Sequence, residues 1–127
     1  MLKPEEKITD AELEVMQALW AAEAPMTLAQ IKAALPQRNG DTTKTLLRRL
    51  CHKGAVSSEK KEVYYYHPIV AQDELGCYRT RKLIDKLYAG SAKAMVASLV
   101  EHEQLQSKDV EELREMFEDL WKKEGNE

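Results

Sequence analysis

The chain has 127 residues, of which 43% are hydrophobic, 32% are charged and 6% are aromatic, and its formal net charge is −3. A chain of this length builds one small domain or a domain with one extension. It contains no run of about 18 apolar residues that would span a membrane, and its charged N-terminus, with Pro4, lacks the apolar core of a signal peptide. We therefore expect a cytoplasmic protein with no direct membrane binding.

The charges are distributed unevenly along the chain. Between Arg38 and Lys61, seven basic residues face two acidic ones, whereas from Glu101 onward ten acidic residues face four basic ones. The mildly acidic chain thus contains one strongly basic segment. Such a segment is typical of proteins that bind the phosphates of nucleic acids.

Residue types that support catalysis or metal binding are not grouped in this sequence. Cys51 and Cys77 are far apart, and neither has a second cysteine or a histidine at the spacing of metal ligands, although His52 is adjacent to Cys51. The histidines are scattered, and no glycine-rich phosphate-binding loop is present. We expect no enzymatic activity, no metal and no cofactor. The cysteines are interpreted as packed structural residues, with oxidation sensing by either of them as the alternative.

Two capping boxes predict two helices near the N-terminus. Thr9 with Glu12 begins a helix over residues 9–22, whose apolar positions recur at helical spacing. Thr27 with Gln30 begins a second, shorter helix. The two helices are separated by only a short turn.

A basic helix followed by a β-hairpin is predicted next. Turn and cap signals at residues 39–41 precede a helix over residues 42–53, which Gly54 ends. One side of this helix is apolar, and its outer surface is basic and rich in hydroxyl groups. Strands over residues 55–59 and 63–67 follow, joined by a turn at Lys60-Lys61-Glu62.

The remainder of the chain reads as three amphipathic helices. They are predicted over residues 71–89, after a cap at Ser91, and after a cap at Ser107. Short linked helices that cannot enclose one another bury their apolar stripes by association, so we expect a homodimer. The expected dimerisation residues are Leu87, Tyr88, Val96, Leu99, Leu113, Phe117 and Leu120.

The order helix, helix, basic helix, hairpin is that of a winged helix-turn-helix domain, whose third helix enters the major groove. We expect a mainly α fold with a small β-hairpin, in which residues 1–68 form an N-terminal winged-helix DNA-binding domain and residues 69–127 a helical dimerisation arm. Lysine and arginine neutralise phosphates, and threonine approaches base edges closely. The candidate DNA-binding residues are Thr42, Lys44, Thr45, Arg48, Arg49, Lys60, Lys61 and Tyr64.

Five stretches of the chain match motifs of one protein family. They are residues 8–16 with Leu19 and Trp20; Thr42, residues 45–47, 49–50 and 53–55; Val63, Tyr64 and Tyr66 before Pro68; residues 88–91; and Met95 with Val96. On these motifs the chain resembles the penicillinase-repressor family of bacterial regulators, the BlaI, MecI and CopY group.

The resemblance implies a homodimeric repressor that binds double-stranded operator DNA at a palindrome and blocks transcription of genes for antibiotic resistance or metal handling. It implies a recognition helix over residues 41–53 and a wing over residues 55–67. The chain departs from the family pattern at two places. Residues 38–40 are Arg-Asn-Gly where the family often has Trp-Ser/Thr-Pro, and Lys61-Glu62 replaces a frequent Gly-Arg at the wing tip.

The resemblance also bears on the inducing signal, which is either proteolysis or a ligand. In the β-lactam branch of the family, a membrane sensor protease pathway leads to cleavage of the repressor within its dimerisation region. The corresponding pair here is Ser98-Leu99, where that branch usually has Asn-Phe. The copper branch binds metal through C-terminal Cys-x-Cys motifs, but no cysteine follows Cys77.

One other class of function fits the same predicted fold. A winged-helix domain can bind a protein partner without binding DNA sequence-specifically. A steep loss of duplex affinity with added salt distinguishes the two functions, because only DNA binding releases condensed counterions.

Overall fold

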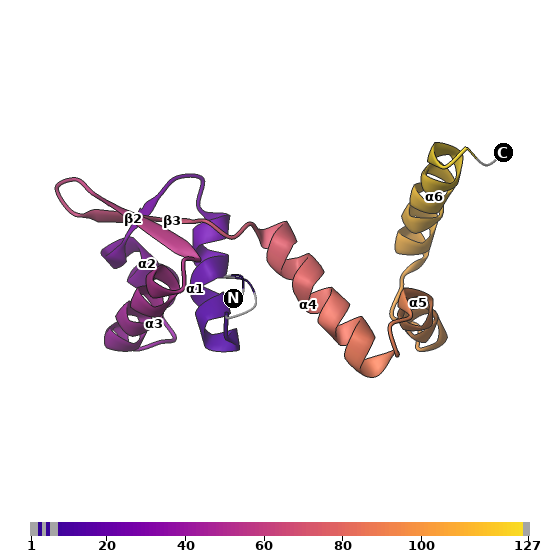
Figure 1. Cartoon of the computed structure of the whole chain (residues 1–127), viewed down its shortest axis with the longest axis horizontal. Coiled ribbons are helices and arrows are strands. Elements are labelled where there is room, and N and C mark those ends of the chain that lie inside the picture. The colour runs from indigo at the N-terminus through magenta and orange to yellow at the C-terminus, as the bar shows by residue number, and fades with distance from the viewer. Residues whose placement is uncertain (1–2, 4, 6–7, 126–127) are drawn as a thin grey trace. The chain divides into compact units, whose positions relative to one another are not determined.

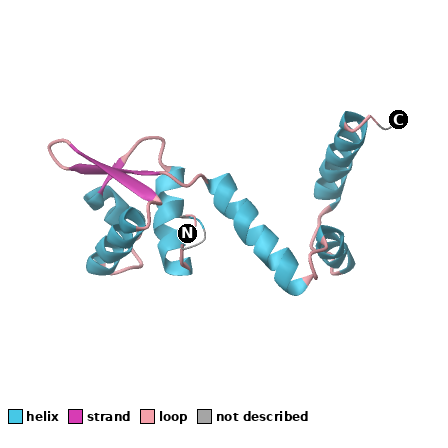
Figure 2. Cartoon of the chain, viewed as in Figure 1, coloured by secondary structure: helices cyan, strands magenta, loops and turns pink. Residues whose placement is uncertain are grey.

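The structure is a computed structural model that describes residues 3, 5 and 8–125. The chain forms two compact units, the first ending at Thr80 and the second beginning at Arg81. Helices dominate both units, and all described strands belong to the first (Figures 1 and 2). The elements in chain order are α1 (Asp10–Ala21), β1 (Met26–Thr27), α2 (Leu28–Ala34), α3 (Gly40–His52), β2 (Val56–Lys60), β3 (Tyr64–Pro68), α4 (Gln72–Leu87), α5 (Ala92–Glu101) and α6 (Ser107–Lys123).

Local capping signals set the starts of the first three helices. In α1, the Thr9 hydroxyl accepts the N–H of Glu12 while the Glu12 carboxylate accepts the N–H of Thr9. The same reciprocal pair joins Thr27 and Gln30 at the start of α2. Asn39 caps α3, its side-chain oxygen accepting the N–H of Asp41 at 2.7 Å. Both predicted capping boxes are confirmed, and α3 begins at Gly40, two residues earlier than expected.

The three helices enclose the core of the first unit. The apolar side of α3 packs against α1 and α2, as its pattern predicted. Gly54 follows α3 with a φ of 81°, the left-handed conformation that glycine adopts without strain. The core also contains Val70 and Leu75, so the first compact unit continues beyond Pro68 into the early part of α4. Its buried apolar residues are Ile8, Val15, Met16, Leu19, Ile31, Leu35, Leu46, Leu47, Leu50, Ala55, Val56, Val70 and Leu75.

The sheet of the first unit has three antiparallel strands in the order β1-β3-β2. The hairpin pairs Lys60 with Tyr64 and Val56 with Pro68, so each strand begins one residue later than predicted. Its turn projects beyond the helices (Figure 1). Strand β1, which the sequence pattern did not predict, pairs Met26 with Tyr66. The order helix, strand, helix, helix, hairpin is that of a winged helix-turn-helix domain.

The second unit consists of the end of α4 followed by α5 and α6. Ser91 caps α5 as predicted, accepting the N–H of Ala94. The predicted cap at Ser107 is wrong, because Ser107 is the first residue of α6 and Gln106 is the N-cap. The carboxylate of Asp109 accepts the Gln106 N–H at 3.4 Å. Asp109 therefore pairs with an N-cap that lies one residue before the serine that the sequence suggested.

Candidate nucleic-acid interface

Helix α3 presents two chemically different sides. Thr43, Leu46, Leu47 and Leu50 are buried against the other helices. Because the helical period places residues three or four apart on one side, the residues between them face solvent. The exposed residues predicted to bind DNA on this helix are Thr42, Lys44, Thr45, Arg48 and Arg49. The helix is thus packed on the core through its leucines and presents cations and hydroxyl groups to solvent.

A groove of about 900 Å³ separates α3 from the wing. Four of the predicted DNA-binding residues line it, Lys44 and Arg48 from α3 and Lys60 and Tyr64 from the hairpin. Three cations thus surround one concave surface that also contains apolar and aromatic groups. Thr42, Thr45, Arg49 and Lys61 do not line this groove.

The wing carries one lysine–tyrosine pair on each face. The Nζ of Lys60 lies 5.8 Å from the centroid of the Tyr64 ring, on the groove side. The Nζ of Lys61 lies 5.7 Å from the centroid of the Tyr65 ring. Lys61 and Glu59 line a separate, smaller cavity. Cations over aromatic faces are held electrostatically while their ammonium groups stay accessible. Lys60, the last residue of β2, and Lys61, in the turn, therefore lie at different surfaces of the wing.

Two of the seven cations of the basic segment pair with carboxylates of α1. Arg38 binds Glu14, and Lys53 binds Glu12 with an Nζ to Oε1 distance of 2.5 Å. The Arg38 hydrogen bond holds the pKa of Glu14 below its ordinary value. The basic segment therefore contains exposed cations as well as cations that form ion pairs with α1. A count of charges along the sequence did not distinguish the two kinds.

Residues outside the predicted set also form the groove. Tyr66 and Ser58 line it, together with the N-cap and the first two residues of α2. Tyr66 and Ser58 lie two positions from Tyr64 and Lys60, so strand alternation contained the signal for them. The rings of Tyr64 and Tyr66 lie 6.4 Å apart. The other three residues are Thr27, the N-cap of α2, and Leu28 and Ala29 in its first turn, and no local pattern in the sequence placed them beside the wing.

The family model for the penicillinase repressor matches residues 8–119. The chain belongs to the penicillinase repressor family. The penicillinase repressor of Staphylococcus aureus is 28% identical over 127 residues, with 97% of this chain and 100% of the relative covered. The penicillinase repressor of Bacillus licheniformis is 29% identical, covering 89% of this chain and 91% of the relative. The methicillin resistance regulatory protein MecI of Mammaliicoccus sciuri is 29% identical, covering 87% and 93%.

Part of this penicillinase repressor family member is similar to a solved structure of a BlaI protein. It is the solution structure of the monomeric form of Bacillus licheniformis BlaI in complex with the blaP half-operator. The two chains are 30% identical, with 57% of this chain and 93% of the other covered, and the TM-score is 0.49.

The thiols of this family member occupy different environments. Cys51 is half-buried and lines the groove, and burial raises the pKa of its thiol. A thiol with a raised pKa is protonated at neutral pH and reacts slowly with oxidants. Cys77 is exposed on α4. In the part of the chain that the structure describes, no three side chains of the metal-binding types come together.

The second unit of this family member leaves large apolar side chains exposed. Leu87 is 64% exposed, Phe117 56% and Leu120 53%, while Tyr88, Val96 and Leu113 are half-buried and Leu99 is 38% exposed. An apolar groove of about 550 Å³ runs between α5 and α6, with Phe117 and Trp121 in its lining. No helix among residues 8–125 has the length and apolar character to cross a membrane.

Proposed function

We propose that this family member is a transcriptional repressor that acts in the cytoplasm, binds a palindromic operator as a homodimer and leaves it on an inducing signal. The observation that carries the proposal is the set of cations around the groove, Lys44 and Arg48 from α3 and Lys60 from the wing. Duplex DNA carries closely spaced phosphates, which such a concave cationic surface neutralises. The names of the relatives, penicillinase repressor and methicillin resistance regulatory protein, support a regulator of antibiotic-resistance genes rather than an enzyme.

The proposed division of labour follows from side-chain chemistry. Arg49 and Arg48 are suited to bidentate contacts with guanine or phosphate, and Thr42 suits close contact with a base edge. The Thr45 hydroxyl donates to the carbonyl of Asp41 at 3.0 Å, so its methyl group and oxygen lone pairs are what it offers to DNA. Lys60 and Tyr64 would contact backbone, which positions the protein without reading sequence.

Dimerisation through the second unit is the second part of the proposal. It is supported by the exposed apolar side chains of α5 and α6, which a second copy would cover. A two-fold dimer presents two recognition helices about 34 Å apart, which is one turn of DNA. The expected division into a DNA-binding region, residues 1–68, and a dimerisation region, residues 69–127, belongs to this proposal.

Induction by cleavage at Ser98-Leu99 is proposed on the position of that bond. It lies inside α5, where the carbonyl of Ser98 accepts the N–H of His102 at 3.1 Å. Because proteases bind extended backbone, α5 must open before the bond is cut, so a sensor protease pathway would act on an opened form. A ligand that displaces DNA from the groove is the other inducing signal that this proposal keeps.

The DNA-binding proposal is tested with a duplex that the chain itself selects from a randomised pool. The double variant Lys44→Ala/Arg49→Ala should reduce affinity and flatten the slope of log affinity against log salt by about two units, since each phosphate contact contributes about 0.9. Lys93→Ala/Lys123→Ala removes the same charge from the second unit as a control. No enrichment of any sequence, or a salt-independent interaction, would instead favour a winged-helix domain that binds protein.

The dimer is tested by sedimentation equilibrium on two single variants. Phe117→Glu places a charge on the exposed apolar face of α6 and should produce a monomer. Lys108→Gln changes the net charge by the same amount at an exposed position and should leave the dimer intact. A dimeric Phe117→Glu variant would show that this face is not the interface.

A further inference from the structure

Helix α1 binds both ends of the recognition helix through ion pairs. Arg38 lies two residues before the start of α3, and Lys53 is its C-cap. Their partners Glu14 and Glu12 are only two residues apart on α1. We refer to these two ion pairs as the α1 clamp. A helix of 13 residues is thereby tied at each end to a single turn of α1.

The C-terminal pair of the clamp is buried on its acidic side. The Glu12 side chain is 1% exposed and its Oε1 accepts from Lys53 and from the Thr9 N–H. Its Oε2 is buried without a hydrogen-bond partner among the described residues. A buried carboxylate is costly unless it is paired, so the position of Lys53 is strongly constrained. That constraint acts directly on the residue that ends α3.

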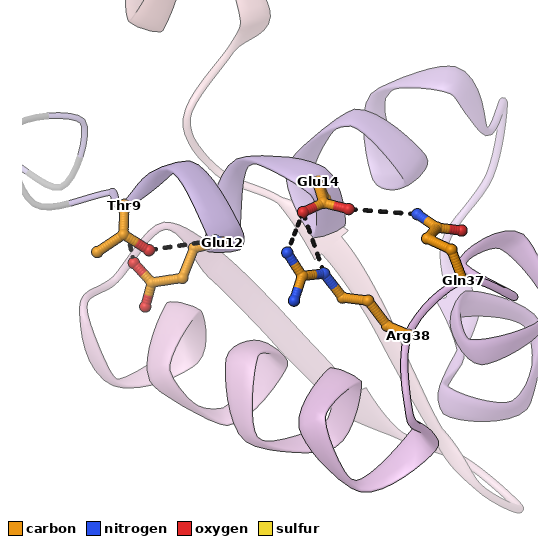
Figure 3. A network of polar contacts seen from close by, with 5 residues as sticks. All are labelled: Thr9, Glu12, Glu14, Gln37 and Arg38. Atoms are coloured by element: carbon orange, nitrogen blue, oxygen red, sulfur yellow. Dashed lines mark hydrogen bonds and ion pairs between the residues drawn. The ribbon is translucent and has the colours of Figure 1, made fainter.

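The N-terminal pair is more exposed and more directional. Glu14 Oε2 accepts from Arg38 Nε at 3.0 Å and from a second guanidinium nitrogen, and Glu14 Oε1 accepts from Gln37 at 3.2 Å. Figure 3 shows Glu14 between Arg38 and Gln37, with both donors on the segment that leads into α3. Planar guanidinium–carboxylate pairs fix orientation as well as distance. The segment immediately before the Asn39 cap is therefore held.

The apolar packing of α3 alone does not give the same constraint. Leu46, Leu47 and Leu50 bury the middle of the helix, but apolar contact is non-directional and tolerates small rotations and shifts. Contacts to base edges require accurate placement, whereas contacts to phosphate are tolerant. The ion pairs at both ends are directional and therefore constrain the orientation of α3, which the leucine contacts alone do not.

We propose that Glu12 and Glu14 are positioning residues that set how the recognition helix is presented to DNA, although neither belongs to the basic face. The inference rests on the proposed DNA binding and adds to it a source of sequence specificity in α1. Its signature is a fall in affinity for the selected duplex relative to poly(dI-dC). Loss of one negative charge elsewhere on the protein would raise the affinity for both ligands alike.

The experiment compares Glu14→Ala and Glu12→Gln with Glu23→Ala and Glu23→Gln, which make the same chemical changes at an exposed residue after α1. For each full-length variant, affinity is measured for the selected duplex and for poly(dI-dC). The ratio of the two affinities should fall about tenfold for the clamp variants, the size expected when one coupled interaction is lost. It should stay constant for the Glu23 variants. An unchanged ratio in both clamp variants would overturn the inference.

A charge swap provides the rescue and guards against misfolding. Glu14→Arg and Arg38→Glu should each lower the affinity ratio, and the double variant Glu14→Arg/Arg38→Glu should restore most of it, because the ion pair is rebuilt with its direction reversed. A double variant as poor as the two singles would overturn the inference. If the wild-type chain enriches no duplex at all, the proposed DNA binding is wrong. An unchanged affinity ratio in the variants contradicts only the positioning role of Glu12 and Glu14.

Amide hydrogen exchange on DNA-free protein gives an independent readout. The N–H of Thr43 and the N–H of Lys53 donate to helix carbonyls at the two ends of α3. Glu14→Ala should speed exchange at Thr43, and Glu12→Gln should speed it at Lys53, while Leu47 in the middle of the helix stays protected. Unchanged exchange at both ends would contradict the clamp.

Discussion

Trp20 and Val70 are joined by a hydrogen bond across 50 residues of sequence, the indole N–H donating to the Val70 carbonyl at 2.9 Å. The N–H groups of Ile69 and Val70 in turn donate to the carbonyl of Ala55, where the hairpin begins. The chain leaving the wing is therefore fastened both to α1 and to the base of the hairpin. This arrangement holds the wing at a fixed place beside the recognition helix.

Trp20→Phe removes this donor and leaves the carbonyl of a buried residue unpaired. We expect the free energy of unfolding to fall by about 1–3 kcal/mol, the cost of an unsatisfied buried acceptor. Urea denaturation followed by circular dichroism measures it. Tyr64→Phe, which removes a hydroxyl from a ring that is 49% exposed, should change stability by less than about 0.5 kcal/mol. Equal effects of the two variants would contradict the role given to Trp20.

The carboxylates of α1 should make stability depend on pH below neutrality. Burial raises the pKa of Glu12, but hydrogen bonds from Lys53 and Thr9 lower it further than burial raises it, so the net pKa is below the ordinary 4.5. A depressed pKa in the folded state means that the stabilisation is complete above about pH 5 and is lost as pH falls through the folded-state value. The difference in unfolding free energy between wild type and Glu12→Gln should therefore shrink from pH 5 to pH 3. Urea titrations at several pH values test this, with a constant difference as the contrary result.

Asn39→Ala should weaken the start of the recognition helix. The Asn39 side chain accepts the N–H of Asp41, and its loss leaves that donor without its cap. We expect a loss of about 1 kcal/mol, as for other N-cap residues. Asn39→Asp, which keeps an acceptor at the helix N-terminus, should stay within a few tenths of a kcal/mol of wild type. Thermal denaturation of both variants provides the comparison, and a stable Asn39→Ala protein would show that the cap is not needed.

Glu103→Gly should stabilise the end of α5. Glu103 has a φ of 54°, and the N–H of Gln104 donates to the carbonyl of Leu99, so Glu103 occupies the left-handed position of a helix-ending motif that favours glycine. Relief of this strain should contribute about 0.5–1 kcal/mol after the entropy of the added glycine is subtracted. Limited proteolysis within α5 should slow accordingly. Ala97→Gly, at an exposed position inside the helix, should act in the opposite direction.

The sequence predicted the parts of the fold that depend on neighbouring residues. The capping boxes at Thr9 and Thr27 and the glycine after α3 each rest on groups within a few positions, and all are found. Strand β1 was missed because two residues carry no periodicity, and its partner Tyr66 lies 40 positions away from Met26. No end was predicted for α5, because Glu103 occupies the left-handed position at which a glycine would normally mark the end of a helix.

The sequence predicted which cations of the candidate site are exposed, but not which cations of the basic segment form ion pairs with α1. Exposure of Lys44, Arg48 and Arg49 follows from the helical period. No local pattern, however, shows that Arg38 and Lys53 bind α1 carboxylates 24 and 41 positions earlier. Ion pairs between distant segments depend on the crossing of two helices, which exists only once the core has formed.

The exposed apolar faces of α5 and α6 have a consequence for gene dosage. The second unit buries little apolar surface by itself, so in the proposed dimer it is stabilised by contact with the second copy. Its folded fraction therefore depends on the concentration of the chain in the cell. At concentrations below the dimer dissociation constant, halving the number of chains lowers the dimer population about fourfold by mass action. If synthesis of the chain stopped, dilution during one round of cell growth would lower the dimer concentration by this factor.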